Sequence, residues 1–284
     1  MSVMRTLAGI SNEHLFHHSE AVVYVEGGES SRTAIPTASA DVLFWRGLFD
    51  RFAVGHRFHF KPRCGKQTLL TLVDRMEDGT ITAVIVCMDR DHDHIRGLRA
   101  TSRVLYSYGY SWENDIWSVD VVEEAFYTLC GVDRNSVAVR ASVSDALAQF
   151  ARWMRWPVYA DVLAALRADS VIPRGNLKCV VPPGRGWPSI DGAFLFDCVK
   201  KARIRASGVV LKLPASVTVA VWRDACGHVL SYFCYRMLAD LLKTHSGQNI
   251  TRQFADAIAI KLGWELMQPD VLQHHKAQFA RLNS

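Results

Sequence analysis

The chain has 284 residues, enough for one large domain or two ordinary ones. Hydrophobic residues make up 49% and charged residues 21%, which is typical of a folded globular protein and excludes collagen-like or wholly disordered architectures. Lys and Arg number 33 against 28 Asp and Glu, and the resulting formal charge of +5 allows a polyanionic partner without requiring one.

Seven scattered cysteines, with no Cys-x-x-Cys pair, predict reduced thiols in a cytoplasmic protein and no structural zinc. The most apolar late stretch, residues 208–222, is interrupted by Lys212 and Pro214. We therefore expect no membrane association.

The first half of the chain alternates between strand and helix patterns. Short apolar runs rich in β-branched residues predict strands at 21–25, 57–60, 81–88 and 104–108, and apolar residues at helical spacing predict helices at 40–52 and 65–76. Strands separated by helices indicate an α/β fold with a mainly parallel sheet flanked by helices.

After about residue 118 the pattern changes to long amphipathic segments. These predict helices at 119–130, 143–156, 160–168, 191–203, 219–243 and 251–266. The C-terminal half is therefore expected to be mostly α-helical.

Three carboxylates fall at predicted strand ends. Glu26 follows the first strand and precedes two glycines, while Asp89 and Asp91 follow the third strand, where alternation in an extended chain would put both on one side. If the strands are neighbours, the three acids converge and need a cation, for which oxygen ligands select Mg²⁺ or Mn²⁺. The alternative is that each acid is a solvated loop residue, because short acidic patterns are common by accident.

Val25-Glu26-Gly27 at one strand end and Asp89-Arg90-Asp91 at another resemble the Toprim domain of bacterial primases, topoisomerases and overcoming-lysogenization-defect nucleases. The resemblance covers roughly residues 21–114. It implies a compact Toprim domain in which Glu26 assists proton transfer and the aspartate pair holds Mg²⁺ for phosphodiester chemistry. We accordingly expect a catalytic domain at 18–130 and a helical domain at 131–284 for dimerisation, partner and substrate contacts.

Residues 41–45, 65–66 and 110–114 look like the Toprim subfamily that accompanies ABC-type ATPases in bacterial anti-phage loci. This resemblance implies an effector that its ATPase partner holds inactive. On release, triggered by a phage anti-restriction protein, the effector forms a homodimer and cleaves host tRNA to stop translation.

The second acid of the Toprim motif is ambiguous in this chain. The usual motif continues with Ser or Thr and then an acid, whereas here Glu29 precedes Ser30. Either Glu29 takes the role, or residues 28–37 are an insertion and Asp41 takes it; the spacing to Phe44-Trp45 favours Asp41 slightly. The choice decides whether one or two metals bind.

Glu113, after the fourth predicted strand, has two interpretations of equal weight. It either orients a metal-bound water or interacts with the start of the following helix.

Several basic residues are candidates for nucleic-acid contact. Gly65-Lys66 lacks the glycine and the Ser or Thr of a phosphate loop, so Lys66 is either a nucleic-acid contact or a solvated lysine. The cluster Lys200, Lys201, Arg203 and Arg205 suits a phosphate backbone, although a solvated basic face is the usual explanation.

Two aromatic or apolar sets were also assigned from helical spacing. Arg152-Trp153-Met154-Arg155-Trp156 interleaves cations with flat rings, which would suit unpaired RNA bases, but the three-residue spacing of Trp153 and Trp156 favours the core. Within 219–243, either a dimer surface or internal packing explains Val221, Trp222, Leu230, Phe233 and Met237.

Taken together, the residues favour a metal-dependent Toprim endoribonuclease that acts on tRNA. The alternatives are a Toprim nuclease that nicks or cleaves DNA and a non-catalytic module that regulates the ATPase. Clustered acids favour catalysis.

Overall fold

The computed structural model describes residues 7–28, 39–95, 97–99, 101–134, 138–174, 177–182, 187–206 and 212–282. The chain forms two compact units. The first comprises residues 1–89, 99–107 and 269–284, and the second comprises residues 90–98 and 108–268. The predicted boundary after residue 130 therefore falls inside the second unit.

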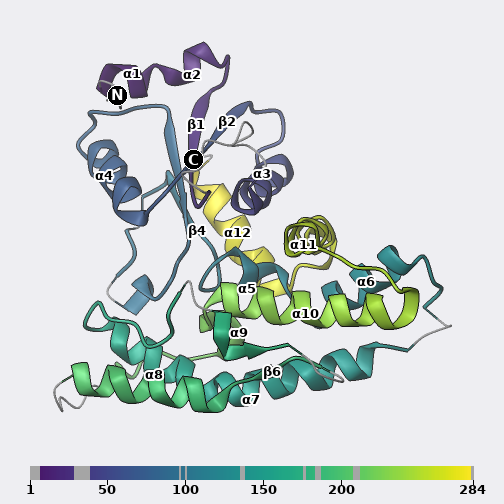
Figure 1. The fold of residues 1–284 in the computed structure, drawn as a ribbon. Coiled ribbons are helices and arrows are strands. Elements are labelled where there is room, and N and C mark those ends of the chain that lie inside the picture. The colour runs from purple at the N-terminus through teal and green to yellow at the C-terminus, as the bar shows by residue number, and fades with distance from the viewer. Residues whose placement is uncertain are drawn as a thin grey trace, which may run out of the picture. The chain divides into compact units, whose positions relative to one another are not determined.

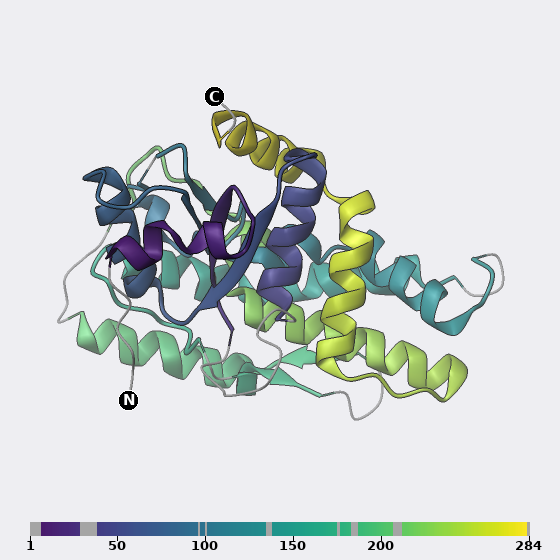
Figure 2. The same ribbon diagram turned by 90° about the horizontal axis from the view of Figure 1, so that it is seen from above.

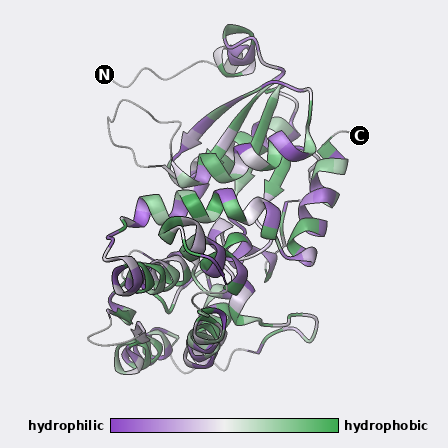
Figure 3. Ribbon diagram, turned by 90° about the vertical axis from the view of Figure 1, so that its right-hand side faces the viewer, coloured by the Kyte–Doolittle hydropathy of each residue, from purple (hydrophilic) through white to green (hydrophobic). Residues whose placement is uncertain are grey.

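The first unit is built on a four-stranded, all-parallel sheet in the order β2-β1-β3-β4. Its strands are β1 (Ala21–Glu26), β2 (Phe58–Arg63), β3 (Val84–Met88) and β4 (Val104–Tyr106). Figure 3 shows most of the sheet in the hydrophobic colour, with purple at one edge, and every residue of β3 is buried. Continuous burial is expected of a parallel strand covered on both faces.

Helices cover both faces of this sheet, with α4 (Lys66–Glu77) on one face and α3 (Ala40–Phe52) on the other (Figure 1). α12 (Pro269–Leu282) lies beside α3 (Figure 2), where the Phe49 and Phe279 rings pack edge-on with centroids 4.9 Å apart. Two short helices, α1 (Leu7–Ser11) and α2 (Glu13–Phe16), precede β1.

Gln278 joins the C-terminal helix α12 to the edge strand β4 of the sheet. Its side-chain oxygen accepts a hydrogen bond from the Tyr106 N–H at 2.7 Å, and its side-chain nitrogen donates to the Tyr106 carbonyl, also at 2.7 Å. β4 is an edge strand, so these bonds satisfy backbone groups that the sheet itself leaves unpaired.

The second unit is mostly helical. Its longer helices are α6 (Val119–Cys130), α7 (Arg140–Ala165), α8 (Gly192–Arg205), α10 (Gly227–Ser246) and α11 (Arg252–Leu266). Short elements complete it, namely η2 (Asp93–Ile95), α5 (Trp112–Ile116), η3 (Leu177–Cys179), α9 (Val221–Asp224) and the two-stranded pair β5 (Val180–Val181) and β6 (Ser189–Ile190). α10 packs against α5, α6 and α11, and α7 packs against α6, α8 and α9.

The α/β class, the parallel sheet flanked by helices and the helical C-terminal region are thus confirmed. Helix α12 was not predicted, and two predicted segments were wrong in detail. The helices expected at 143–156 and 160–168 are one helix, α7, which contains Pro157. The segment expected at 219–243 is divided into α9 and α10.

The proposed dimer anchors on α10 have another role. Leu230, Phe233 and Met237 are at most 2% exposed within the second unit itself, and the Phe233 and Phe150 rings lie 4.9 Å apart. Internal packing therefore accounts for these three residues, and a dimer surface does not need them.

Candidate active site

Glu26 and Asp89 meet at the carboxyl edge of the sheet. β1 and β3 are adjacent and parallel, with Val25 opposite Cys87, so the chain segments that leave both strands begin side by side. The Asp89 N–H lies 3.2 Å from Glu26 Oε2, to which it donates a hydrogen bond. Because β2 and β3 lie on opposite sides of β1, this is also the point where the strand order reverses, and open α/β sheets bind ligands at such points.

Asp41 lies at the same edge. Ser39 caps α3 by accepting a hydrogen bond from the Val42 N–H, which puts Asp41 in the first turn, where the helix dipole favours a carboxylate. A Cβ atom built on Gly27 would lie 2.3 Å from Asp41 Cγ. The Asp41 carboxylate therefore packs against the backbone one residue after Glu26. The other candidate, Glu29, lies outside the described residues.

A cation accompanies these acids. Lys66 begins α4, and its Nζ donates a hydrogen bond to the Asp89 carbonyl oxygen at 2.6 Å. The lysine that resembled part of a phosphate loop is thus held at the carboxyl edge of the sheet, beside Asp89.

Asp91 has a different setting from the one that alternation predicted. β3 ends at Met88, and Asp91 adopts φ +49°, so the extended conformation that would align Asp89 with Asp91 does not continue through the motif. Within the second unit, Asp91 Oδ1 lies 3.4 Å from Arg174 Nη1. Burial raises the pKa of the neighbouring Tyr110 far above its usual value, and the Asp91 charge adds to this effect. Arg174 belongs to no sequence motif, so its place beside Asp91 was not predicted.

His92 and Asp161 form a buried pair next to Asp91 in the chain. His92 Nε2 lies 3.2 Å from Asp161 Oδ2, and each residue is 3% exposed. Asp161 Oδ1 also accepts hydrogen bonds from the backbone N–H groups of Val171 and Ile172. Burial, followed by the charge of Arg90, lowers the pKa of the nearby His94 to about 4.

Glu113 is in the first turn of α5 and is 2% exposed. It accepts a hydrogen bond from the Ser111 hydroxyl at 2.5 Å, and Ser111 with Asn114 forms the capping box of this helix. These contacts favour the helix-start interpretation of Glu113. A metal role for this residue stays a prediction.

The predicted nucleic-acid contacts on α8 fall into two groups. Lys201 pairs with Asp197 at 2.6 Å, and Arg205 forms two bonds to Asp169 at 3.0 and 3.1 Å. Lys200 and Arg203 are exposed.

The expectation that Trp153 and Trp156 are core residues was wrong. Trp153 is 40% exposed and Trp156 is 75% exposed. Helical periodicity therefore identified a shared face of α7 but not how much of it is buried.

Glu26, Asp41 and Asp89 offer the oxygen donors that Mg²⁺ and Mn²⁺ prefer, so the donor set fits such an ion chemically. Among the described residues, however, no three His, Cys, Asp or Glu side chains are grouped so that they could hold one metal ion. Binding of a metal ion at this edge is therefore a proposal.

A comparison with known protein families finds none that matches the chain, and a comparison with curated proteins finds no matching relative. No helix in the described part of the chain is long and apolar enough to cross a membrane.

Proposed function

We propose that the chain is a Toprim-like nuclease that cleaves phosphodiester bonds in RNA. The observation that carries the proposal is the grouping of Glu26, Asp41 and Asp89 at the carboxyl edge of two adjacent parallel strands. The motif resemblance adds Asp91 to the catalytic set. An interaction module has no physical need to gather acids at one sheet edge.

In the proposed reaction, Glu26 takes the proton of the attacking hydroxyl or water. The attacking oxygen forms a bond to phosphorus, and the bond from phosphorus to the leaving oxygen breaks. Lys66 holds the Asp89 backbone in place through its carbonyl. Mg²⁺ or Mn²⁺ would be held by Glu26, Asp41 and Asp89, and when bound it would neutralise charge on the scissile phosphate.

The biological setting rests on the resemblance alone. The stretch from Val23 to Ser31 looks most like AriB, the Toprim effector of the PARIS anti-phage defence system. We therefore propose that an ATPase like AriA holds the chain inactive, that the released chain dimerises in the cytoplasm, and that its substrate is host tRNA.

Sequencing of RNA ends tests this function. RNA from cells that express the chain, released from its ATPase partner, is compared with RNA from cells that express Glu26→Ala. We expect new cuts concentrated in tRNA that the variant lacks. Cuts in DNA alone would favour the DNA nuclease, and damage to neither nucleic acid would favour the regulatory module.

The Glu26 carboxylate lies at a strand end and contributes little to core packing, so Glu26→Ala should fold normally. A circular dichroism spectrum and an unfolding curve that match those of the parent chain provide this control. Near-normal cleavage by a folded Glu26→Ala protein would contradict the proposed site.

A further inference from the structure

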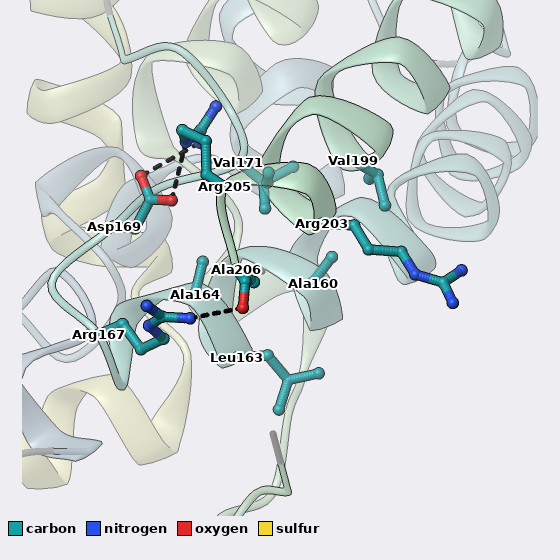
Figure 4. A pocket seen from close by; sticks show the side chains of 11 residues that line it. Ala160, Leu163, Ala164, Arg167, Asp169, Val171, Val199, Arg203, Arg205 and Ala206 are labelled. Atoms are coloured by element: carbon teal, nitrogen blue, oxygen red, sulfur yellow. Dashed lines mark hydrogen bonds and ion pairs between the residues drawn. The ribbon is translucent and has the colours of Figure 1, made fainter. Parts of the chain in front are cut away.

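A pocket of about 260 Å³ lies between α7 and α8 in the second unit (Figure 4). Small and aliphatic side chains form its floor, namely Ala160, Leu163, Ala164, Val171, Val199 and Ala202. Part of this floor continues into a small buried cluster that includes Cys198. The volume is slightly below the range of pockets that hold drug-sized ligands, which suits a single flat ring system.

The rim of the pocket is cationic, with three arginines against one aspartate. Figure 4 shows Arg205 paired with Asp169, and Arg167 bonded to the Ala206 carbonyl at 2.9 Å. Arg203 lies on the opposite side in this view and is exposed, with no ion pair among the described residues. The rim therefore offers positive charge to an anionic ligand.

Exposed aromatic rings extend this surface along both helices. Trp156, 75% exposed, precedes Ala160 by four residues and so lies on the same face of α7 as the pocket floor. Phe196, 72% exposed, precedes Val199 by three residues on α8. A single exposed aromatic side chain is common on protein surfaces, whereas several of them beside an apolar pocket mark a binding surface.

We infer that this surface, defined by Trp156, Phe196, Arg203 and the pocket floor, binds unpaired nucleotides of an RNA loop. Arginines neutralise the phosphates, exposed rings stack on bases, and an apolar pocket takes a base that has left its stack. An apolar protein segment would fill the floor equally well, but it would leave the exposed charge of Arg203 without an anionic partner. The inference rests on the proposed RNA-directed function and assigns its substrate contacts.

Fluorescence anisotropy tests the inference without relying on cleavage. The full-length chain carrying Glu26→Ala is titrated into a labelled RNA hairpin with a single-stranded loop and, separately, into a fully paired RNA duplex of equal length. Adding Trp156→Ala should weaken hairpin binding about fivefold or more, because stacking on one base contributes at least that much. Duplex binding should change less than about twofold.

Arg203→Ala should weaken binding to the hairpin. It should also reduce the slope of log affinity against log salt concentration by about one. Ala164→Leu, which fills the pocket, should act like Trp156→Ala. Matched controls are Phe254→Ala, which removes a ring 51% exposed on α11, and Arg103→Ala, which removes an exposed arginine of the first unit. Neither control should change hairpin affinity.

Hairpin affinity that stays unchanged in folded Trp156→Ala and Arg203→Ala proteins would overturn the inference. So would equal weakening of hairpin and duplex binding by Trp156→Ala, because the surface would then not read unpaired nucleotides. Both residues are exposed, so their variants test the inference even if Ala164→Leu fails to fold. Loop binding through this surface by a chain that cuts no RNA would support the inference and contradict only the proposed nuclease.

Discussion

Replacing Gly27 with alanine should both strain the backbone and displace the Asp41 carboxylate, and a control glycine can separate the two effects. Gly27 has φ +112°, where an L-residue is strained by about 1–3 kcal/mol. The new Cβ would also lie 2.3 Å from Asp41 Cγ, so the carboxylate must move. Because that carboxylate is the end of a side chain, its displacement should add little to the loss of stability. It should nevertheless remove Asp41 from its place beside Glu26.

Gly55→Ala is the matched control. Gly55 also has a positive φ, +88°, but no atom lies within 4 Å of a Cβ built there. Urea unfolding should give both variants similar losses of about 1–3 kcal/mol. Cleavage of tRNA should fall at least about tenfold in Gly27→Ala and in Asp41→Ala, and stay near the parent level in Gly55→Ala. Equal activity of folded Gly27→Ala and Gly55→Ala would refute the reasoning, as would an active Asp41→Ala.

Three further changes test other contacts. Lys66→Met should cost about 1–2 kcal/mol in urea unfolding, since it removes the charged donor to the Asp89 carbonyl; an unchanged unfolding midpoint would argue against that bond. Asp161→Ala leaves three buried donors unpaired and should cost about 3–5 kcal/mol, whereas the exposed Asp145→Ala on the same helix should cost less than about 0.5 kcal/mol. Burial lowers the pKa of His94 to about 4, below the usual histidine pKa of about 6.5. The neutral form of His94 therefore stabilises the fold above pH 6.5, and this contribution is lost as the pH falls toward 4. After a discount for partial exposure, moving from pH 7 to pH 4.5 should cost the parent chain about 1–2 kcal/mol more than His94→Gln, and equal losses would contradict this pKa.

Short apolar runs and helical spacing were sufficient to predict the sheet. Every predicted strand overlaps an observed one, and the helix predicted at 40–52 matches α3 at both ends. These elements are buried on one or both faces, so burial leaves a strong periodicity in the sequence. The strand-end positions of Glu26 and Asp89 followed from the same signal.

Errors arose where tertiary contacts outweigh local signals. Pro157 marks a helix boundary by propensity, yet it lies inside α7 and is buried there, where packing of the long helix opposes the break. Trp156 was placed in the core because periodicity identifies a shared face but cannot say whether that face is covered. Gln278 and Arg174 carry no motif at all, and their roles depend on partners 172 and 83 residues away in the chain.

The choice between Asp41 and Glu29 shows what spacing cannot decide. Glu26 ends β1 and Asp41 lies 15 residues later in α3, so the distance along the chain does not set the distance in space. The capped start of α3 fixes Asp41, and Gly27 lets it approach, because any larger residue would occupy the space of its carboxylate. Lys66, bonded to the Asp89 carbonyl, brings a positive charge to the edge where the Asp89 N–H meets Glu26. Contacts in space at Gly27 and Asp89, which no spacing along the chain records, therefore place Asp41 and Lys66 at this edge.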